Sequence, residues 1–237
     1  MAPTINRKPA VTVVRGLFPL LLATACVPAV AHGPRITRGF SGGLSASLTT
    51  GPKYSGGDDG PSNFLYGPTG LNAAYGWTLS ANGPALRFGF HVPVPAVFLV
   101  QPDVYLQAPR SVTRTFAFGV GVSAWAIELG SVAMPYLQVG RIDDDQSGWY
   151  TTQGYFRNDR NLNAHSRPVL RSTAWVPSIA YQRGGSRTTT HFFLTGVFGT
   201  QHSRCNAFSD SVCSRDRRTA AFVGMTLERH KRVSGSR

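Results

Sequence analysis

Long apolar runs, charged residues and cysteines are all scarce in this chain of 237 residues. Beyond the N-terminal segment, no run approaches the roughly 20 apolar residues that a transmembrane helix needs. Asp, Glu, Lys and Arg make up 15% of the chain, against about 25% in a typical soluble domain. Low charge without a spanning helix is typical of a transmembrane β-barrel, whose apolar residues recur at every second position.

Lysine is nearly missing as well. Only Lys8, Lys53 and Lys231 are lysines among 24 basic residues, although the formal net charge is +13. The arginines have two interpretations, a GC-rich genome or attraction to anionic groups such as lipopolysaccharide phosphates, which arginine binds with its planar fork. The sequence has no basic helix, RNA-binding motif or zinc pattern, so we expect no nucleic-acid partner.

Signatures of catalysis are missing too. The chain has no G-x-S-x-G elbow, no H-E-x-x-H and no phosphate-binding loop. The acidic run at 143–145 lacks the spacing and the glycine of a calcium loop. We therefore expect no catalysis, no cofactor and no metal site. A lipid A-modifying enzyme remains an alternative, with His165, Ser166 and His202 as the residues to test.

Residues 1–31 have the features of a secretory signal peptide. Arg7, Lys8 and Arg15 form a basic front, an apolar run follows at 17–25, and Ala29, Val30 and Ala31 form an A-x-A cleavage site. A second interpretation is a bacterial lipoprotein box at 22–26, in which Cys26 would be lipidated. Either way the sequence predicts export, with one mature domain at 32–237.

Two cysteines remain after this segment, Cys205 and Cys213. An even number of cysteines in an oxidising compartment favours a disulfide between them. His202 lies nearby, so metal binding is the alternative, but one histidine and two cysteines make a thin ligand set.

The stretch at 71–79 shows the pattern on which the fold prediction depends. Leu71, Ala73, Tyr75 and Trp77 share one face of a strand, and the other face carries Asn, Ala, Gly and Thr, with no charged residue. A face in open water normally carries charges, so the small polar face suits a crowded interior and the apolar face suits lipid. The same alternation predicts eight strands in total, at 36–50, 71–79, 86–92, 113–127, 133–142, 169–183, 188–201 and 217–230.

The connections between these segments alternate in length. Tight links near 80–84, 129–131 and 184–186 separate long segments at 51–70, 143–167 and 202–216, and the region 96–111 could be a loop or an extra strand pair. Short turns at one rim and long loops at the other are the layout of outer-membrane barrels. An even strand count would place both chain ends in the periplasm.

This layout over residues 36–230 resembles the small eight-stranded outer-membrane barrels of Gram-negative bacteria, of the outer-membrane protein A and X type. The resemblance rests on the layout and on no residue signature. It implies an all-β, antiparallel, up-and-down transmembrane β-barrel of about eight strands in the cell outer membrane.

Five polar residues fall on the predicted inward faces. We expect them to form a hydrogen-bonded and ionic network, since an interior of about eight strands is just wide enough for side chains to fill it; Arg87 and Glu228 are a candidate pair. The five are Arg87, His91, Gln138, Gln182 and Glu228.

The predicted role is structural. Long loops on a rigid barrel would meet lipopolysaccharide or a protein partner. The alternatives are a lipid A-modifying enzyme, a narrow channel, and a soluble or lipidated lipocalin-like barrel with an apolar ligand inside.

Overall fold

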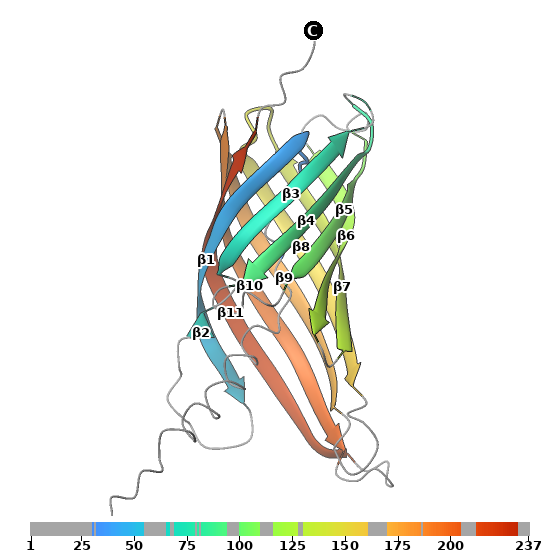
Figure 1. Ribbon diagram of the computed structural model, residues 1–237. Coiled ribbons are helices and arrows are strands. Elements are labelled where there is room, and N and C mark those ends of the chain that lie inside the picture. Colours follow the sequence, from blue (N-terminus) through green and yellow to red (C-terminus); the bar gives the residue numbers. More distant parts are fainter. Residues whose placement is uncertain are drawn as a thin grey trace, which may run out of the picture.

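The protein is an antiparallel β-barrel (Figure 1), seen in a computed structural model. The structure describes residues 30, 32–54, 65–66, 69–78, 80, 82–93, 100–109, 116–127, 130–160, 170–185, 187–204 and 212–231. Within these residues, no helix is long and apolar enough to span a membrane.

Ten strands of the described chain close the barrel, and a two-residue strand lies beside the first of them. Neighbours in sequence pair antiparallel, and β1 pairs with β11 to remove any open edge. The eleven elements are β1 Gly39–Tyr54, β2 Leu65–Tyr66, β3 Gly70–Thr78, β4 Ala85–Pro93, β5 Gln101–Gln107, β6 Phe116–Ile127, β7 Gly130–Ile142, β8 Gly148–Arg160, β9 Leu170–Gly184, β10 Thr188–Arg204 and β11 Val212–His230.

The prediction of eight strands is wrong. Each of the eight predicted segments forms a strand, and the structure adds β5 and β8. β5 comes from the region 96–111, where prolines obscured the alternation. β8 lies inside the segment 143–167, which the sequence analysis predicted as a polar loop. The strand was missed because its outward face carries Thr151 and Gln153 between Trp149 and Tyr155 and so shows no apolar alternation.

A tight turn takes the place of the first part of that predicted loop. Asp143 N donates to Ser147 O over 2.9 Å, and Gln146 adopts a positive φ of 68°. The turn lies on the same rim as the links at 79–84 and 185–187 and the end of β11, and we call this rim the turn rim. The opposite rim, here the loop rim, carries the ends of β1, β8 and β10 and the starts of β3, β9 and β11. The end of β6 at Ile127 and the start of β7 at Gly130 also lie at this rim, only a few residues apart in the sequence, which corrects the predicted division of short and long links.

Side chains alternate strictly between the two faces of the barrel wall. Along β5, Gln101, Asp103, Tyr105 and Gln107 are buried while the three residues between them are exposed. Large apolar side chains lie outside on most strands, for example Phe88 at 50%, Val120 at 49% and Val223 at 56% exposure. The buried side of the wall is therefore mostly polar and the exposed side mostly apolar, as predicted.

Glycines on the inward face of β6 make room for two tyrosines. Tyr105 and Tyr136 stack with their ring centroids 5.9 Å apart and an interplanar angle of 3°. A Cβ at Gly121 would lie 2.3 Å from the Tyr136 ring, and one at Gly119 would lie 2.4 Å from the Tyr105 hydroxyl. Tyr136 is buried in the lumen at 4% exposure.

The segment before β1 lies inside the barrel, a feature that strand periodicity does not indicate. Residues from His32 to Ile36 are buried, and Ile36 packs in one apolar cluster with Ala85, Tyr105 and Tyr136. Val30 is partly buried against the same cluster. The lumen therefore contains a stretch of backbone in addition to the side chains of the wall.

We expect Gly121→Val to lower the free energy of unfolding by about 1–3 kcal/mol, because an added side chain must displace a ring that is itself packed and hydrogen-bonded. Val122→Ile, on the exposed face of the same strand, is the matched control and should change stability by less than about 0.5 kcal/mol. Denaturant titrations of the two refolded variants, followed by tryptophan fluorescence, measure the difference. Equal midpoints would contradict the inward placement of Gly121.

Candidate functional site: the lumen

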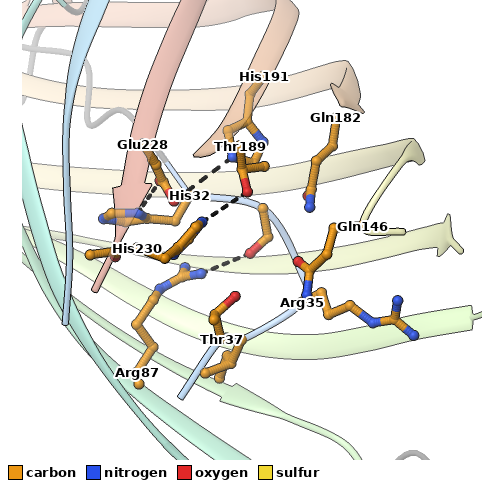
Figure 2. Close-up of a pocket in the computed structure, with 14 residues that line it drawn as sticks. His32, Arg35, Thr37, Arg87, Gln146, Gln182, Thr189, His191, Glu228 and His230 are labelled. Atoms are coloured by element: carbon orange, nitrogen blue, oxygen red, sulfur yellow. Dashed lines mark hydrogen bonds and ion pairs between the residues drawn. The ribbon is translucent and has the colours of Figure 1, made fainter. Parts of the chain in front are cut away.

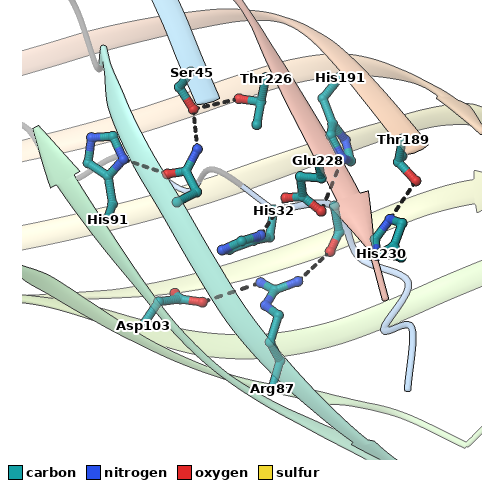
Figure 3. A network of polar contacts seen from close by, with 12 residues as sticks. His32, Ser45, Arg87, His91, Asp103, Thr189, His191, Thr226, Glu228 and His230 are labelled. Carbon is teal, nitrogen blue, oxygen red and sulfur yellow. Dashed lines mark hydrogen bonds and ion pairs between the residues drawn. The ribbon is translucent and has the colours of Figure 1, made fainter. Parts of the chain in front are cut away.

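The lumen contains all five polar residues that the sequence placed on inward faces. Arg87 and His91 come from β4, and the others come from three strands on further parts of the wall: Gln138 from β7, Gln182 from β9 and Glu228 from β11. None is more than 5% exposed. Figure 3 shows Arg87, His91 and Glu228, each with polar partners inside the barrel.

Arg87 binds Asp103 and not Glu228, the partner expected from the sequence. Its Nη2 lies 3.3 Å from Asp103 Oδ2, and the Tyr136 hydroxyl donates to Asp103 Oδ1 over 2.6 Å. The guanidinium also lies over the Tyr105 ring, 4.7 Å from its centroid. The buried charges of Arg87 and Asp103 thus compensate each other, and the Tyr136 hydroxyl and the Tyr105 ring stabilise the pair.

Glu228 lies between two histidines. His32 Nδ1 is within hydrogen-bonding distance of Glu228 Oε1, and His191 Nε2 lies 3.9 Å from Oε2. The Tyr150 hydroxyl lies 3.2 Å from His191 Nδ1, so the contacts run on to β8. The closest partner of this buried carboxylate therefore comes from the N-terminal segment and not from the wall.

A second set of contacts links short polar side chains near β1. Asn72 donates to Ser45 Oγ, whose hydroxyl lies 2.9 Å from Thr226 Oγ1, and the Asn72 carbonyl meets His91 Nδ1. Gln101 and Ser123 form a further pair between β5 and β6. Pairing of this kind satisfies polar groups that the wall has removed from water.

The wall binds the N-terminal segment mainly through its backbone. Arg87 Nη1 donates to the Gly33 carbonyl over 2.7 Å and Gln138 Nε2 to the His32 carbonyl over 2.9 Å. The Tyr105 hydroxyl donates to the Pro34 carbonyl over 3.2 Å, and Gln107 Oε1 accepts from the Ile36 amide over 2.7 Å.

Arg35 ties the same segment to the turn rim. Its guanidinium donates to the Asp143 carbonyl and lies 3.7 Å from Asp144 Oδ1. The segment is thus bound at the rim as well as within the lumen.

A cavity lies beside this segment (Figure 2). It is partly open to solvent, and His32, Gln182, His191 and Glu228 are among its lining residues. The described residues include no group of three or more His, Cys, Asp or Glu side chains that could hold a metal ion. The cavity is lined by hydrogen-bonding groups, which suits water or a small polar solute.

Sequence reasoning missed several residues of this site. Asp103 lies in the region left open at 96–111, and strict alternation from Gln101 would have placed it inward. His191 was missed because the adjacent Phe192 and Phe193 blurred the alternation of that strand. His32 and Arg35 carried no periodic signal at all.

The other predicted sites fall outside what the structure describes. Cys26 and Cys205 lie outside the described residues, as do His165 and Ser166. The disulfide between Cys205 and Cys213 and the lipidation of Cys26 therefore stay predictions.

Comparisons with known proteins leave the chain without a family. No protein-family model matches it, and no curated protein matches it. A search of solved structures matches Ail, the attachment invasion locus protein of Yersinia pestis, at 13% identity, covering 81% of this chain and 99% of that one. The TM-score is 0.23, a value too low to support an argument from that protein.

We expect Arg87→Leu to lower the free energy of unfolding by about 3–5 kcal/mol, because it leaves the buried Asp103 carboxylate without its cation. The double variant Arg87→Leu, Asp103→Leu should recover part of that loss, since no charge is then left uncompensated. Arg183→Leu, at an exposed position of β9, serves as the matched control and should change little. Denaturant titration measures all three; a double variant less stable than Arg87→Leu would refute the pairing.

Proposed function

We propose that this protein is a non-catalytic integral outer-membrane β-barrel that holds its loop rim at the cell surface for contact with lipopolysaccharide or a protein partner. The observation that carries the proposal is the polarity of the wall. Its exposed face is apolar and its buried face is polar.

The apolar face surrounds the barrel. A soluble protein rarely exposes an apolar patch larger than about 300–600 Å², whereas here large apolar side chains project from the described strands one after another. They include Phe40, Leu44, Leu71, Tyr75, Trp77, Phe88, Val104, Leu106, Phe118, Val120, Trp175, Ile179, Phe192, Leu194, Val223 and Leu227, each at least 41% exposed. A bilayer is the solvent in which such a surface is stable, and closure leaves no strand edge to be satisfied there.

The polar interior disfavours the lipocalin-like alternative. A barrel that binds an apolar ligand needs an apolar interior, and the described lumen instead holds buried charges such as Arg87, Asp103 and Glu228. The same alternation with the faces exchanged would be needed for that function.

The rims support an orientation. Outer-membrane barrels have short periplasmic turns and longer extracellular loops. Here the turn rim holds the start of β1, the end of β11 and the tight turn at 143–147, while β10 and β11 continue to Arg204 and from Val212 on the loop rim. We therefore assign the turn rim to the periplasm and the loop rim to the outside.

Arginine supports lipopolysaccharide as a partner. The strand register puts Arg215 opposite His202 and Arg217 opposite Thr200, toward the loop-rim ends of β10 and β11. Arginine binds phosphate groups through two parallel hydrogen bonds, so a basic strand end at the outer surface fits a phosphorylated glycolipid.

The membrane assignment predicts an asymmetric effect of charge. Val120→Arg, in the middle of β6, should lower stability in lipid by about 2–4 kcal/mol, whereas Thr188→Arg at the rim should cost about 0–1 kcal/mol. Unfolding in lipid vesicles measures both. Equal effects of the two substitutions would argue against a bilayer around the barrel.

Membrane fractionation with a gel shift tests the same assignment in cells. The protein should appear in the outer-membrane fraction and migrate differently before and after boiling, because a closed barrel stays folded in mild detergent. Recovery in the soluble fraction, with no shift, would overturn the proposal.

The loops can be tested on this background. A variant in which short turns replace 161–169 and 205–211 should keep the gel shift and lose binding to immobilised lipopolysaccharide. Binding that survives the removal of both loops would refute their role as the contact surface.

A further inference from the structure

We propose that the barrel encloses a pathway for small cations across the membrane and that residues 32–36 of the same chain are the plug that closes it. The inference rests on the proposed function, since a pathway needs a membrane around it. It assigns to the lumen a role beyond support of the loops.

The lumen of this barrel is wider than its wall side chains fill. An eight-stranded barrel has an interior just wide enough for side chains, and the diameter grows about linearly with strand number. This barrel has ten closing strands among its described residues. The extra space is occupied by the backbone from His32 to Ile36, which is buried along its length.

The plug contacts wall strands on different sides of the lumen. Arg87, Gln138 and Tyr105 each donate to one of its carbonyl groups, and Glu228 binds its His32 side chain. A segment bound by β4, β5, β7 and β11 lies across the lumen and does not follow one strand. Removal of the plug would therefore open the cross-section of the lumen and not merely uncover one side of the wall.

Each of these contacts is replaceable by water. The carbonyls of His32, Gly33 and Pro34 accept from side-chain donors, and the segment precedes the first strand, β1, which begins at Gly39. Release of the segment therefore need not break the strand pairing that closes the wall.

Unpartnered polar atoms lie beside the plug. Gln182 Oε1, Gln138 Oε1 and His191 Nε2 are buried and have no hydrogen-bond partner among the described residues. Gln182 and His191 also line the cavity next to Gly33. Buried polar groups without protein partners normally bind water, so the lumen offers polar positions to a passing solute.

Without the plug, the described lumen carries an excess of negative charge. Among the charged residues buried in the described lumen, His32 and Arg35 belong to the plug, and Arg87 is paired with Asp103. Loss of His32 removes the closest partner of Glu228 and leaves His191 at 3.9 Å. Acidic side chains in a pore favour cations, and Glu228 would set that preference.

Signal-peptide cleavage fits the same arrangement. Cleavage after Ala31 would remove Val30 and make His32 the first residue, so every plug contact named above lies in the mature chain. The free end would then lie in the lumen, beside the Glu228 carboxylate.

Two variants open the pathway in different ways. In one, Ala31 is joined directly to Gly39, which deletes the plug. In the other, Gly33→Val adds a side chain whose Cβ would lie 2.3 Å from Gln182 Oε1 and 2.8 Å from His191 Cε1, so that the plug and these two side chains must move apart while the length of the plug is kept. Arg38→Val introduces the same residue at an exposed position just after the plug and is the matched control.

Single-channel recording in planar lipid bilayers is the readout. Each preparation is first checked for the gel shift between unheated and boiled protein. We expect the wild type and Arg38→Val to be silent and the two plug variants to show discrete conductance steps. Glu228→Gln in the plug-deleted background should shift the reversal potential in a KCl gradient from a cation-selective value toward zero.

The outcomes separate this proposal from the one on which it rests. Plug variants that show the gel shift and stay as silent as wild type would overturn the pathway and leave the membrane barrel intact. Steps of equal size in wild type and variants would overturn the plug. If the deletion variant does not fold, Gly33→Val decides on its own. A wild type that shows no gel shift and does not enter the membrane would instead overturn the proposed function.

Discussion

Every other feature of this structure depends on the closure of the sheet. Pairing of β1 with β11 satisfies the last free edge, and after closure a side chain can only point out of the barrel or into it. The outward set is apolar. The inward set is removed from bulk water, and a charge in such a place needs a partner because desolvation costs more than a single distant attraction returns. The Arg87–Asp103 pair and the histidines around Glu228 are the result of that requirement.

Strand number decides what the inward set must do. With eight strands, side chains alone would fill the interior, and the polar network would be the whole of the core. With ten, the network binds a stretch of backbone instead: Arg87, Tyr105 and Gln138 direct their donors to carbonyl groups of residues 32–34. These three residues therefore bind the N-terminal segment and also form part of the wall.

The alternation of apolar and polar residues predicts most of the fold from the sequence. The prediction fails where neighbouring residues do not differ in polarity. It located eight strands and the inward positions of Arg87, His91, Gln138, Gln182 and Glu228, because lipid and lumen impose opposite polarity on neighbouring residues. It missed β8, since Thr151 and Gln153 on the outward face are polar, and Gln153 accepts a hydrogen bond from the Trp175 indole over 2.9 Å. It also paired Arg87 with Glu228, because alternation fixes the face of a residue but not its height in the barrel. The stagger between strands sets that height, and β5, which supplies Asp103, was not resolved from the sequence.

The N-terminal segment had no periodicity by which it could be found, yet the wall is shaped for it. Gly76 on β3 faces the lumen, and a Cβ there would lie 2.1 Å from the Thr37 carbonyl oxygen and 2.7 Å from Ile36 Cγ2. The close approach of two backbones requires a residue without a side chain at this position. Gly33 on the segment likewise makes a close contact with the wall, since a Cβ there would overlap the Gln182 side chain. Glycines on both the wall and the segment thus allow a close contact, and donors from three strands bind consecutive carbonyls of the segment. This is the complementarity of a binding site. We therefore regard the segment as a functional part of the lumen and not as a tail that happens to fill it.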